Sequence, residues 1–170
     1  MRTSEYQKQF VVTTEREIET DRIVSRVSRT LEGKLDSDGD DPAVYKLDRL
    51  EDGEKEYRAW YRDGQRHRDG APAEIINAYG SDVHRMEAYS ENGLTHRAGD
   101  DDPAVIYRNA SGQVTEIRFY THGFRDRSGG PAVIKFDPET GQEIKLEFWR
   151  RGTQYFPKQP DAGPKFPGLE

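Results

Sequence analysis

A Pro-Ala dipeptide recurs four times in this sequence, and its regular spacing restricts the folds that the chain can adopt. Each copy follows Asp or Gly residues, and the four copies are Pro42-Ala43, Pro72-Ala73, Pro103-Ala104 and Pro131-Ala132. The prolines lie 30, 31 and 28 residues apart, and Pro160 stands 29 residues further on, where a fifth copy would begin. A fixed period of this length is typical of a repeat protein in which each unit packs against its neighbours.

Each unit carries the pattern of two strands joined by a turn. The first strands are β-branched or apolar runs after Pro-Ala: Val44-Tyr45, Glu74-Ile75-Ile76, Val105-Ile106-Tyr107 and Val133-Ile134-Lys135-Phe136. A turn with glycine follows each run, at Asp52-Gly53, Tyr79-Gly80, Ser111-Gly112 and Thr140-Gly141. The second strands mix aromatic and charged residues, as a strand with one wet face does: Tyr57 to Arg62, Arg85 to Ser90, Thr115 to Thr121 and Ile144 to Arg150.

A second glycine ends each unit and reverses the chain again. The dipeptides are Asp63-Gly64, Asn92-Gly93, His122-Gly123 and Arg151-Gly152, and the first two are strong hairpin signals. An aromatic residue stands four positions before each second glycine, at Trp60, Tyr89, Phe119 and Phe148. We therefore predict an all-β fold, in which tandem antiparallel β-hairpin repeats form an elongated meandering sheet.

An arginine follows each of the first three second glycines after four residues. The motifs are Arg66-His67-Arg68, Thr95-His96-Arg97 and Arg125-Asp126-Arg127, and the last unit has Tyr155-Phe156 instead. One interpretation is a ladder of guanidinium groups that grips carboxylate or phosphate. The other, which we favour because the residue recurs in each unit, is that each arginine reaches an Asp in its own corner loop or the adjacent one, or lies over the aromatic ring of the neighbouring unit.

These motifs resemble those of MORN-like and MORN-variant repeats. The resemblance rests on the segment from Trp60 to Ala73, with its Asp63-Gly64 turn and its His-Arg-Asp-Gly-Ala-Pro-Ala ending, and on the echo from Tyr89 to Arg97. The form in which His-Arg precedes Asp-Gly-Pro-Ala looks like repeats of bacteriophage, giant-virus and bacterial proteins. It covers about residues 23 to 156, with a longer period than ordinary MORN repeats. The resemblance implies β-hairpins and an interaction scaffold, with no shared catalytic residues.

The composition agrees with a thin repeat structure. Hydrophobic residues make up 32%, charged residues 34%, and the mean hydropathy is −1.04, which is meagre for one deep core. We find neither an apolar run long enough for a spanning helix nor a secretory signal, and the chain has no cysteine. These features favour a cytoplasmic protein without disulfides.

The two ends of the sequence depart from the repeat. Residues 1–22 are predicted to form an N-terminal cap segment, with a strand at Phe10 to Thr14 and a turn or short helix at Glu15 to Asp21. Residues 23–156 form the repeat domain, opened by a strand at Ile23 to Arg29. Residues 157–170 contain four prolines and are predicted to be a disordered tail, in which Leu169-Glu170 has the character of a cloning remnant.

Charge is distributed unevenly although the net charge is −6. Residues 32–56 contain ten acids and four bases, whereas residues 57–68 contain four arginines and one aspartate. An arginine strip beside aromatic residues suits phosphate and stacked bases, so a nucleotide- or nucleic-acid-binding module is one hypothesis. The acidic overall balance instead favours a polarised surface that orients a charged protein partner.

Catalytic and metal motifs are weak. His67 and His96 belong to successive units and His84-Arg85 breaks the unit pattern, but no nucleophile motif accompanies these histidines. The segment Asp36 to Asp40 resembles the start of a calcium loop, yet Leu47 occupies the position that needs a bidentate Glu. We therefore predict neither enzyme activity, nor a cofactor, nor a metal.

The favoured hypothesis is a protein-protein interaction scaffold or inhibitor, a phage or viral factor that binds and modulates a host protein. The partner is then an unidentified protein, and the chain is a monomer or an edge-paired homodimer. The candidate partner-binding residues are Arg58, Trp60, Tyr61, Arg62, Arg66, His67, Arg68, His84, Arg85, His96, Arg97 and Arg127.

Overall fold

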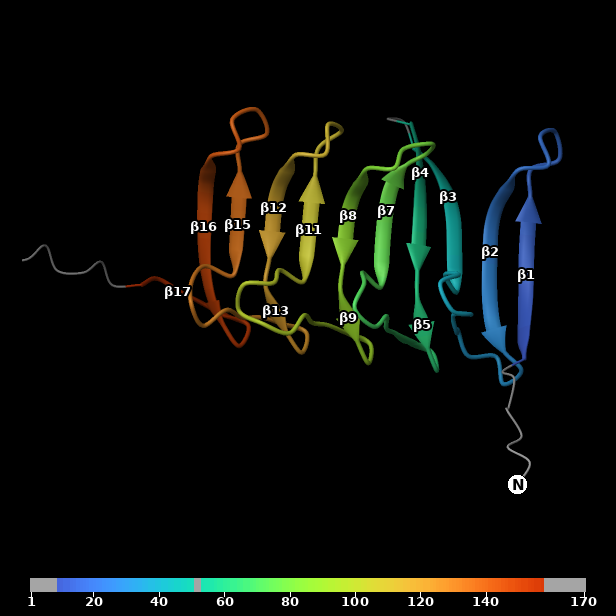
Figure 1. Cartoon of the computed structure of the whole chain (residues 1–170), viewed down its shortest axis with the longest axis horizontal. Helices are drawn as coiled ribbons and strands as arrows, with labels where there is room; N and C mark the ends of the chain where they lie inside the picture. Colours follow the sequence, from blue (N-terminus) through green and yellow to red (C-terminus); the bar gives the residue numbers. More distant parts are fainter. Residues whose placement is uncertain (1–8, 51–52, 158–170) are drawn as a thin grey trace, which may run out of the picture.

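The chain folds as one long antiparallel sheet, as the repeat pattern predicts. A computed structural model describes residues 9–50 and 53–157, so the prediction for the tail lies almost wholly outside the described residues. Eleven strands lie side by side in the order β1-β2-β3-β4-β7-β8-β11-β12-β15-β16-β17, and the sheet does not close on itself (Figure 1). The described ends of the chain therefore lie at opposite ends of an elongated ribbon.

Consecutive strands pair as hairpins throughout the sheet. The long strands are β1 (Phe10–Arg16), β2 (Ile23–Thr30), β3 (Val44–Leu50), β4 (Gly53–Ala59), β7 (Glu74–Ala78), β8 (His84–Ala88), β11 (Val105–Arg108), β12 (Val114–Arg118), β15 (Val133–Phe136) and β16 (Glu143–Arg150). In the N-terminal segment the strand extends to Arg16 and a turn follows, in which Asp21 has a φ of 55°. None of the described residues forms a helix, so none spans a membrane as a helix.

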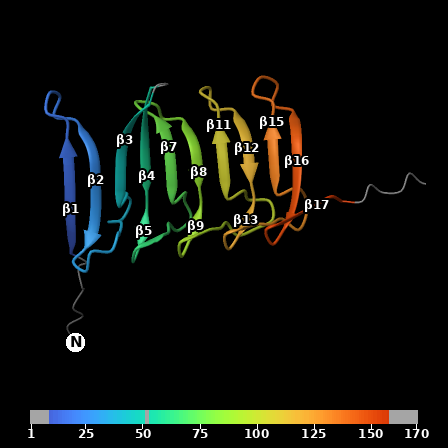
Figure 2. The same ribbon diagram turned by 180° about the vertical axis from the view of Figure 1, so that it is seen from behind.

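Short hairpins continue the second strand of each unit beyond a break at its aromatic residue. They are β5 (Tyr61–Arg62) with β6 (Gln65–Arg66), β9 (Ser90–Glu91) with β10 (Leu94–Thr95), and β13 (Tyr120–Thr121) with β14 (Phe124–Arg125). In the last unit β16 continues without a break and pairs with β17 (Thr153–Tyr155). All four hairpins lie on the side of the sheet where the second strands end, here named the corner edge (Figures 1 and 2). This side is distinct from the two outer edges, which are formed by the first and last strands of the sheet order.

The turns of these short hairpins explain the recurring second glycine. Both central residues of each turn have positive φ, for example 50° at Asp63 and 83° at Gly64, which is the geometry of a type I′ hairpin. Each glycine N–H also donates to a backbone carbonyl of the preceding unit, as Gly64 does to Leu35 at 2.8 Å and Gly93 to Arg66 at 2.9 Å. The same bonds recur at Gly123 and Gly152. The turns therefore join neighbouring units at the corner edge.

The alanines of the four Pro-Ala copies are among the most buried of the described residues. Ala43, Ala73, Ala104 and Ala132 are all 0% exposed. The strand register places each beside an aromatic residue, and Phe119 N–H donates to the carbonyl of Ala132 at 2.8 Å. A small side chain at this place leaves room for the large ring next to it. The packed hydrophobic cluster of Phe119, Ala132 and Ile134 shows this arrangement.

The single layer has two faces, which the register separates. Residues opposite each other in paired strands point to the same face, and alternate residues point to opposite faces. One face, here named the Ile face, carries the row Arg58, Ile75, Glu87, Ile106, Ile117 and Ile134. The other carries the row Tyr57, Ile76, Met86, Tyr107, Glu116 and Lys135. No second layer of described strands covers either face.

Candidate protein-binding face

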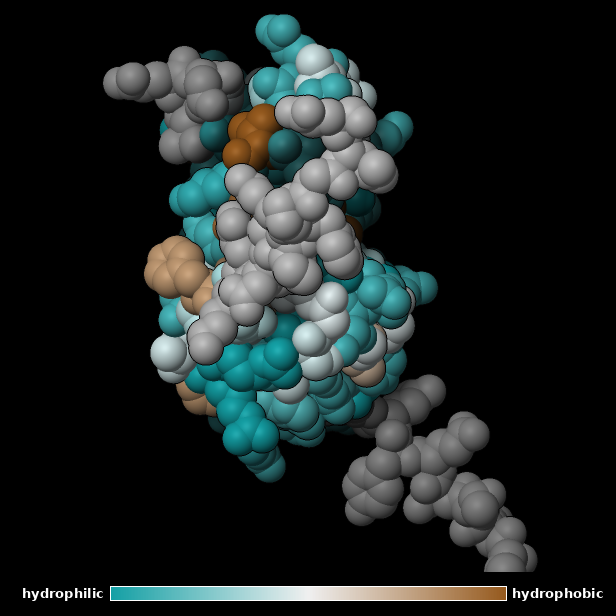
Figure 3. Space-filling model, turned by 90° about the vertical axis from the view of Figure 1, so that its left-hand side faces the viewer, coloured by the Kyte–Doolittle hydropathy of each residue, from teal (hydrophilic) through white to brown (hydrophobic). Residues whose placement is uncertain are grey.

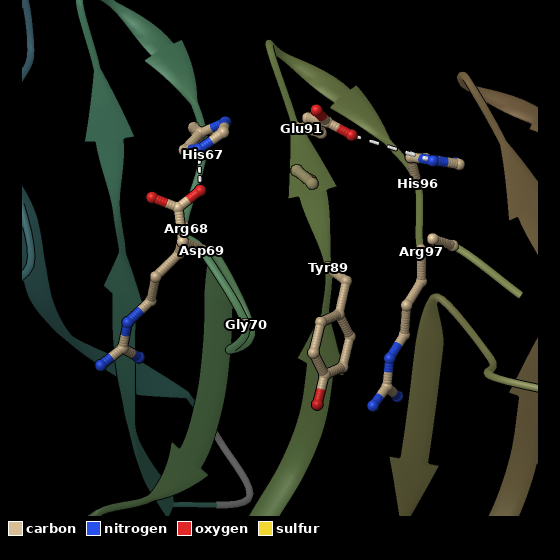
Figure 4. A pocket seen from close by; sticks show the side chains of 10 residues that line it. His67, Arg68, Asp69, Gly70, Tyr89, Glu91, His96 and Arg97 are labelled. Carbon is tan, nitrogen blue, oxygen red and sulfur yellow. Dashed lines mark hydrogen bonds and ion pairs between the residues drawn. The ribbon is translucent and has the colours of Figure 1, made fainter.

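Three of the predicted binding residues, here named the corner arginines, each lie over the aromatic ring of their own unit and not, as predicted, over the ring of the neighbouring unit. Each guanidinium carbon is 3.9 Å from a ring centroid, in the pairs Arg68 over Trp60, Arg97 over Tyr89 and Arg127 over Phe119. Each guanidinium also donates to the carbonyl of the following Pro, at 3.3 to 3.4 Å. Figure 4 shows the side chain of Arg97 extended beside the ring of Tyr89. The stacking accounts for the recurrence of these arginines.

His67 and His96 join successive units at the corner edge. Nδ1 of His67 accepts a hydrogen bond from the backbone N–H of Asn92 at 3.3 Å. Nδ1 of His96 accepts the equivalent bond from the N–H of His122 at 3.4 Å, and the two imidazole rings stack with centroids 4.3 Å apart. Because Nδ1 accepts in both residues, the neutral ring carries its proton on Nε2.

Asp36 occupies the same structural position in the segment before the first complete unit. Its Oδ2 accepts from the backbone N–H of Asp63 at 3.0 Å, as the histidines accept from the next turn along. Two different residue types thus supply the same acceptor. The position requires a hydrogen-bond acceptor more than it requires a histidine.

Two open clefts lie along the corner edge. A cleft of about 390 Å³ is lined by residues of two successive corners, among them His67, Asp69, Glu91 and His96 (Figure 4). His67 Nε2 lies 2.8 Å from Asp69 Oδ1, and His96 Nε2 lies 3.8 Å from Glu91 Oε2. The pKa of the Asp69 carboxyl is lowered by its bonds with Arg62 and then His67.

The second cleft, of about 540 Å³, lies one unit nearer the N-terminus. Asp36, Asp40, Trp60 and Arg68 are among its lining residues. Among residues 9–50 and 53–157, no group of three or more His, Asp or Glu side chains is arranged to hold a metal ion. The histidine and charged side chains that line the two clefts pair with one another.

The arginine strip of residues 57–68 does not form one surface. Arg58 lies in the row of Ile75 and therefore on the Ile face. Arg66 bonds to Glu74, which the register places on the opposite face. Each arginine of the strip is also paired with an acid: Arg58 with Glu56, Arg62 with Asp69, Arg66 with Glu74 and Arg68 with Asp40.

Trp60 is buried and therefore does not contribute to an exposed surface. Its side chain is only 4% exposed, and its indole N–H donates to the carbonyl of Asp40 at 2.9 Å. It lies beneath Arg68. Its contribution is to the packing of the corner.

His84 and Arg85 lie away from the corner edge, at the start of β8. His84 Nδ1 is 2.6 Å from Glu87 Oε1, and the other carboxylate oxygen of Glu87 is 3.1 Å from Arg108. Arg85 donates to the backbone carbonyl of Arg108 at 3.0 Å. A β-bulge in the pairing of β7 with β8 stands at this place, but bulges recur at the equivalent positions of β11 with β12 and of β15 with β16, so the bulge does not explain the break in the sequence pattern.

The face opposite the Ile face carries the most distinctive set of side chains, and we name it the Tyr face. It is defined by Tyr57, Tyr61, Arg66, Tyr107, Arg118, Tyr120, Arg125 and Trp149, all of them half-buried. Register places Tyr57, Tyr107 and Arg118 there, and the remaining residues join through their contacts with side chains on this face. Arg118 lies 4.8 Å from the Tyr107 ring centroid and Arg125 lies 4.9 Å from that of Trp149.

Ion pairs and hydrogen bonds fix the charged groups of the Tyr face. Arg66 pairs with Glu74, and Arg118 donates to Glu116 at 2.6 Å. Arg125 donates to the Tyr120 hydroxyl at 3.2 Å. Trp149 donates through its indole N–H to Glu147 at 3.1 Å, and Glu147 also pairs with Lys145.

The Tyr57 hydroxyl is the most perturbed titrating group of this face. Burial, and to a lesser degree the nearby Glu74 carboxylate and Tyr61, raises its pKa to about 12. All three causes disfavour the phenolate. The ring is therefore held as a neutral phenol within the cluster of Tyr61, Arg66 and Glu74.

The units differ where they form the Tyr face. Immediately after the corner aromatic, successive units carry Tyr61, Ser90, Tyr120 and Trp149. Two residues after the second glycine they carry Arg66, Thr95, Arg125 and Gln154. The second unit thus presents small side chains between two units that present large ones.

Sequence reasoning missed most of this face. It selected Tyr61 and Arg66 but not Tyr57, Tyr107, Arg118, Tyr120, Arg125 or Trp149. Alignment of the units at the position after the corner aromatic would have found Tyr120 and Trp149. The remaining residues require the register between strands of different hairpins.

Comparison with protein families, with curated proteins and with solved structures finds no match to this chain. The resemblance to MORN-like repeats therefore remains a prediction from the sequence.

Proposed function

We propose that this chain is a protein-binding scaffold and that its partner docks on the Tyr face. The observation that carries the proposal is the gathering of Tyr, Trp and Arg side chains on one side of a single-layer sheet. These three residue types are enriched among the residues that contribute most to protein interfaces. Each of these side chains is half-buried, so its orientation is largely fixed before a partner binds.

The pairing of charges on this face favours a protein over a nucleic acid. Arg66 and Arg118 each bond to a glutamate, and Lys135 and Lys145 also lie close to glutamates. A phosphate backbone would have to compete with these carboxylates for the cations. A protein surface that combines apolar and polar groups imposes no such competition.

Differences between units supply specificity in this proposal. A partner that lies across the sheet meets Tyr61, Tyr120 and Trp149, whereas Ser90 of the second unit is only 5% exposed. The second unit therefore contributes no ring between those of Tyr61 and Tyr120. Following the resemblance to phage and viral repeats, we propose a protein of an infected host cell as that partner, with the scaffold modulating its activity.

The experiment captures partners from bacterial lysate with the wild-type chain and then measures affinity with the purified partner. Tyr61→Ala combined with Tyr120→Ala removes two rings from the Tyr face. Tyr45→Ala is the control, because Tyr45 pairs with Arg58 and lies on the Ile face. We expect the double variant to raise Kd about 30-fold or more, the effect of losing hot-spot contacts of about 2 kcal/mol, and the control to leave it within a factor of two or three.

Two outcomes would reject the proposal. One is equal loss of binding in the control and in the double variant. The other is recovery of nucleic acid in place of a specific protein, with an affinity for oligonucleotides that falls steeply as salt is raised. Far-UV circular dichroism of each variant shows whether the sheet is retained.

A further inference from the structure

The two outer edges of the sheet differ in how they are protected. The outer side of β1 pairs with no described strand, because β1 is the first strand of the sheet order. At the opposite end, β17 covers β16 from Phe148 to Arg150 and leaves Glu143 to Glu147 open. Among the coloured residues seen from the β16 end, most are hydrophilic and the apolar ones form separate patches (Figure 3). An unprotected edge is a template for pairing with another strand.

The open part of β16 also carries the charges that discourage strand pairing. Glu143, Lys145 and Glu147 alternate along its five residues. In contrast, β1 has no charge, proline or glycine from Phe10 to Thr14, and four of these five residues are β-branched. Val11 is 52% exposed and Val12 is 46% exposed. This composition is typical of a strand that pairs readily with another strand.

We propose that β1 pairs antiparallel with β1 of a second copy of this chain, forming a closed two-fold dimer with one continuous sheet. A register centred on Thr13 pairs the whole strand from Phe10 to Arg16 with itself. Val12 then lies opposite Thr14 of the second copy, and Val11 lies opposite Glu15. No like charges meet in this register, because Arg16 lies opposite Phe10. The strand is therefore self-complementary.

The geometry favours this closed contact over an open chain of copies. A head-to-tail arrangement would place β1 against β16, where β17 already covers three residues and charged side chains alternate over the rest. It would also leave a free edge at each end and grow without limit. A two-fold contact uses each β1 edge once and ends the assembly.

The dimer would place the Tyr faces of both copies on the same side of the joined sheet. Directly opposite residues of an antiparallel pair share a face, so each face continues across the two-fold axis. Dimerisation through β1 does not require that a partner docks on the Tyr face. A dimeric partner would meet two docking faces and bind with avidity.

Sedimentation velocity over a range of protein concentrations tests the proposal. We expect a reversible monomer-dimer equilibrium for the wild type. Val12→Lys places a charge at the centre of the edge and should raise the dimer Kd about tenfold or more, as 1.4 kcal/mol would. Leu146→Lys is the matched control at the other edge, since Leu146 is similarly exposed, and it should leave the equilibrium unchanged.

Single cysteines define the register, because the chain has no cysteine of its own. Thr13→Cys places two sulfurs across the two-fold axis, where the Cα separation of an antiparallel pair allows a disulfide. We expect a covalent dimer of this variant on a non-reducing gel and none for Val11→Cys, whose sulfurs are offset by four residues. A wild type that stays monomeric, a dimer dissociated by Leu146→Lys but not by Val12→Lys, or open-ended oligomers would each overturn the proposal.

Discussion

The corner edge and the Tyr face are built by the same strands, yet they differ in how constant they are from unit to unit. At the corner, the arginine-to-ring distance is 3.9 Å in three successive units, and the alanine is fully buried in four. On the Tyr face, equivalent positions hold Tyr61, Ser90, Tyr120 and Trp149. The constant positions hold neighbouring units together, and the variable positions are free to specialise.

The largest expected effect comes from enlarging a corner alanine. Ala104→Leu inserts three carbons where no side-chain surface is exposed, and we expect it to lower the free energy of unfolding by about 2 to 3 kcal/mol. The measurement is chemical denaturation followed by circular dichroism. Ala98→Leu is the control, because Ala98 is exposed in the adjoining loop, and it should change stability by less than about 0.5 kcal/mol. Equal effects would show that the corner is not tightly packed.

The next largest effect should follow removal of a corner arginine. Arg97→Ala loses the stacking on Tyr89 and the bond to the carbonyl of Pro103, so we expect a loss of about 1 to 2 kcal/mol in denaturation experiments. Arg16→Ala serves as the comparison. Its pair with Asp21 is largely exposed, and its loss should cost well under about 1 kcal/mol. If both variants lose the same amount, the stacking contributes nothing beyond a surface ion pair.

Exchange of a corner histidine tests whether the acceptor or the residue type matters. His67→Leu removes the acceptor for the Asn92 N–H, and we expect it to destabilise the chain by about 1 kcal/mol or more. His67→Asp supplies the acceptor that Asp36 supplies in the equivalent position, and it should recover part of that loss. Thermal unfolding of the two variants side by side makes the comparison. A variant with Asp that is no more stable than the one with Leu would contradict the equivalence.

The smallest effect at neutral pH is expected for Tyr57→Phe on the Tyr face. In the folded chain the pKa of this phenol is raised from 10 to about 12. The neutral form is therefore favoured by folding, and its contribution to stability is complete below pH 10 and lost as the pH rises through 12. Wild type should lose more stability than Tyr57→Phe between these limits, as measured by urea denaturation at several pH values. Parallel curves for the two proteins would show that Tyr57 titrates as an exposed tyrosine.

The repeated hairpins could be predicted from the sequence because their causes are local. Glycine at a positive φ, Asp or Asn before it, and proline at the strand entry each act within a few residues. The faces could not be predicted in the same way. Arg58 and Arg66 belong to one arginine-rich stretch, yet Arg58 lies on the Ile face and Arg66 bonds to Glu74 of the following strand on the other side. Such pairings depend on the register between separate hairpins and on the interruption of the strand at Trp60.

The bonds between the turns give the ribbon a mechanical property. Neighbouring units are joined along their long strands and again at the corner edge, where glycine N–H groups such as that of Gly93 bond to the unit before. The hydrogen bonds between the long strands and those at the corner edge form two separate rows, which resist bending between units more than one row would. The sheet should therefore behave as a stiff strip that keeps its residues at fixed spacing and peels from an end under load, one unit at a time.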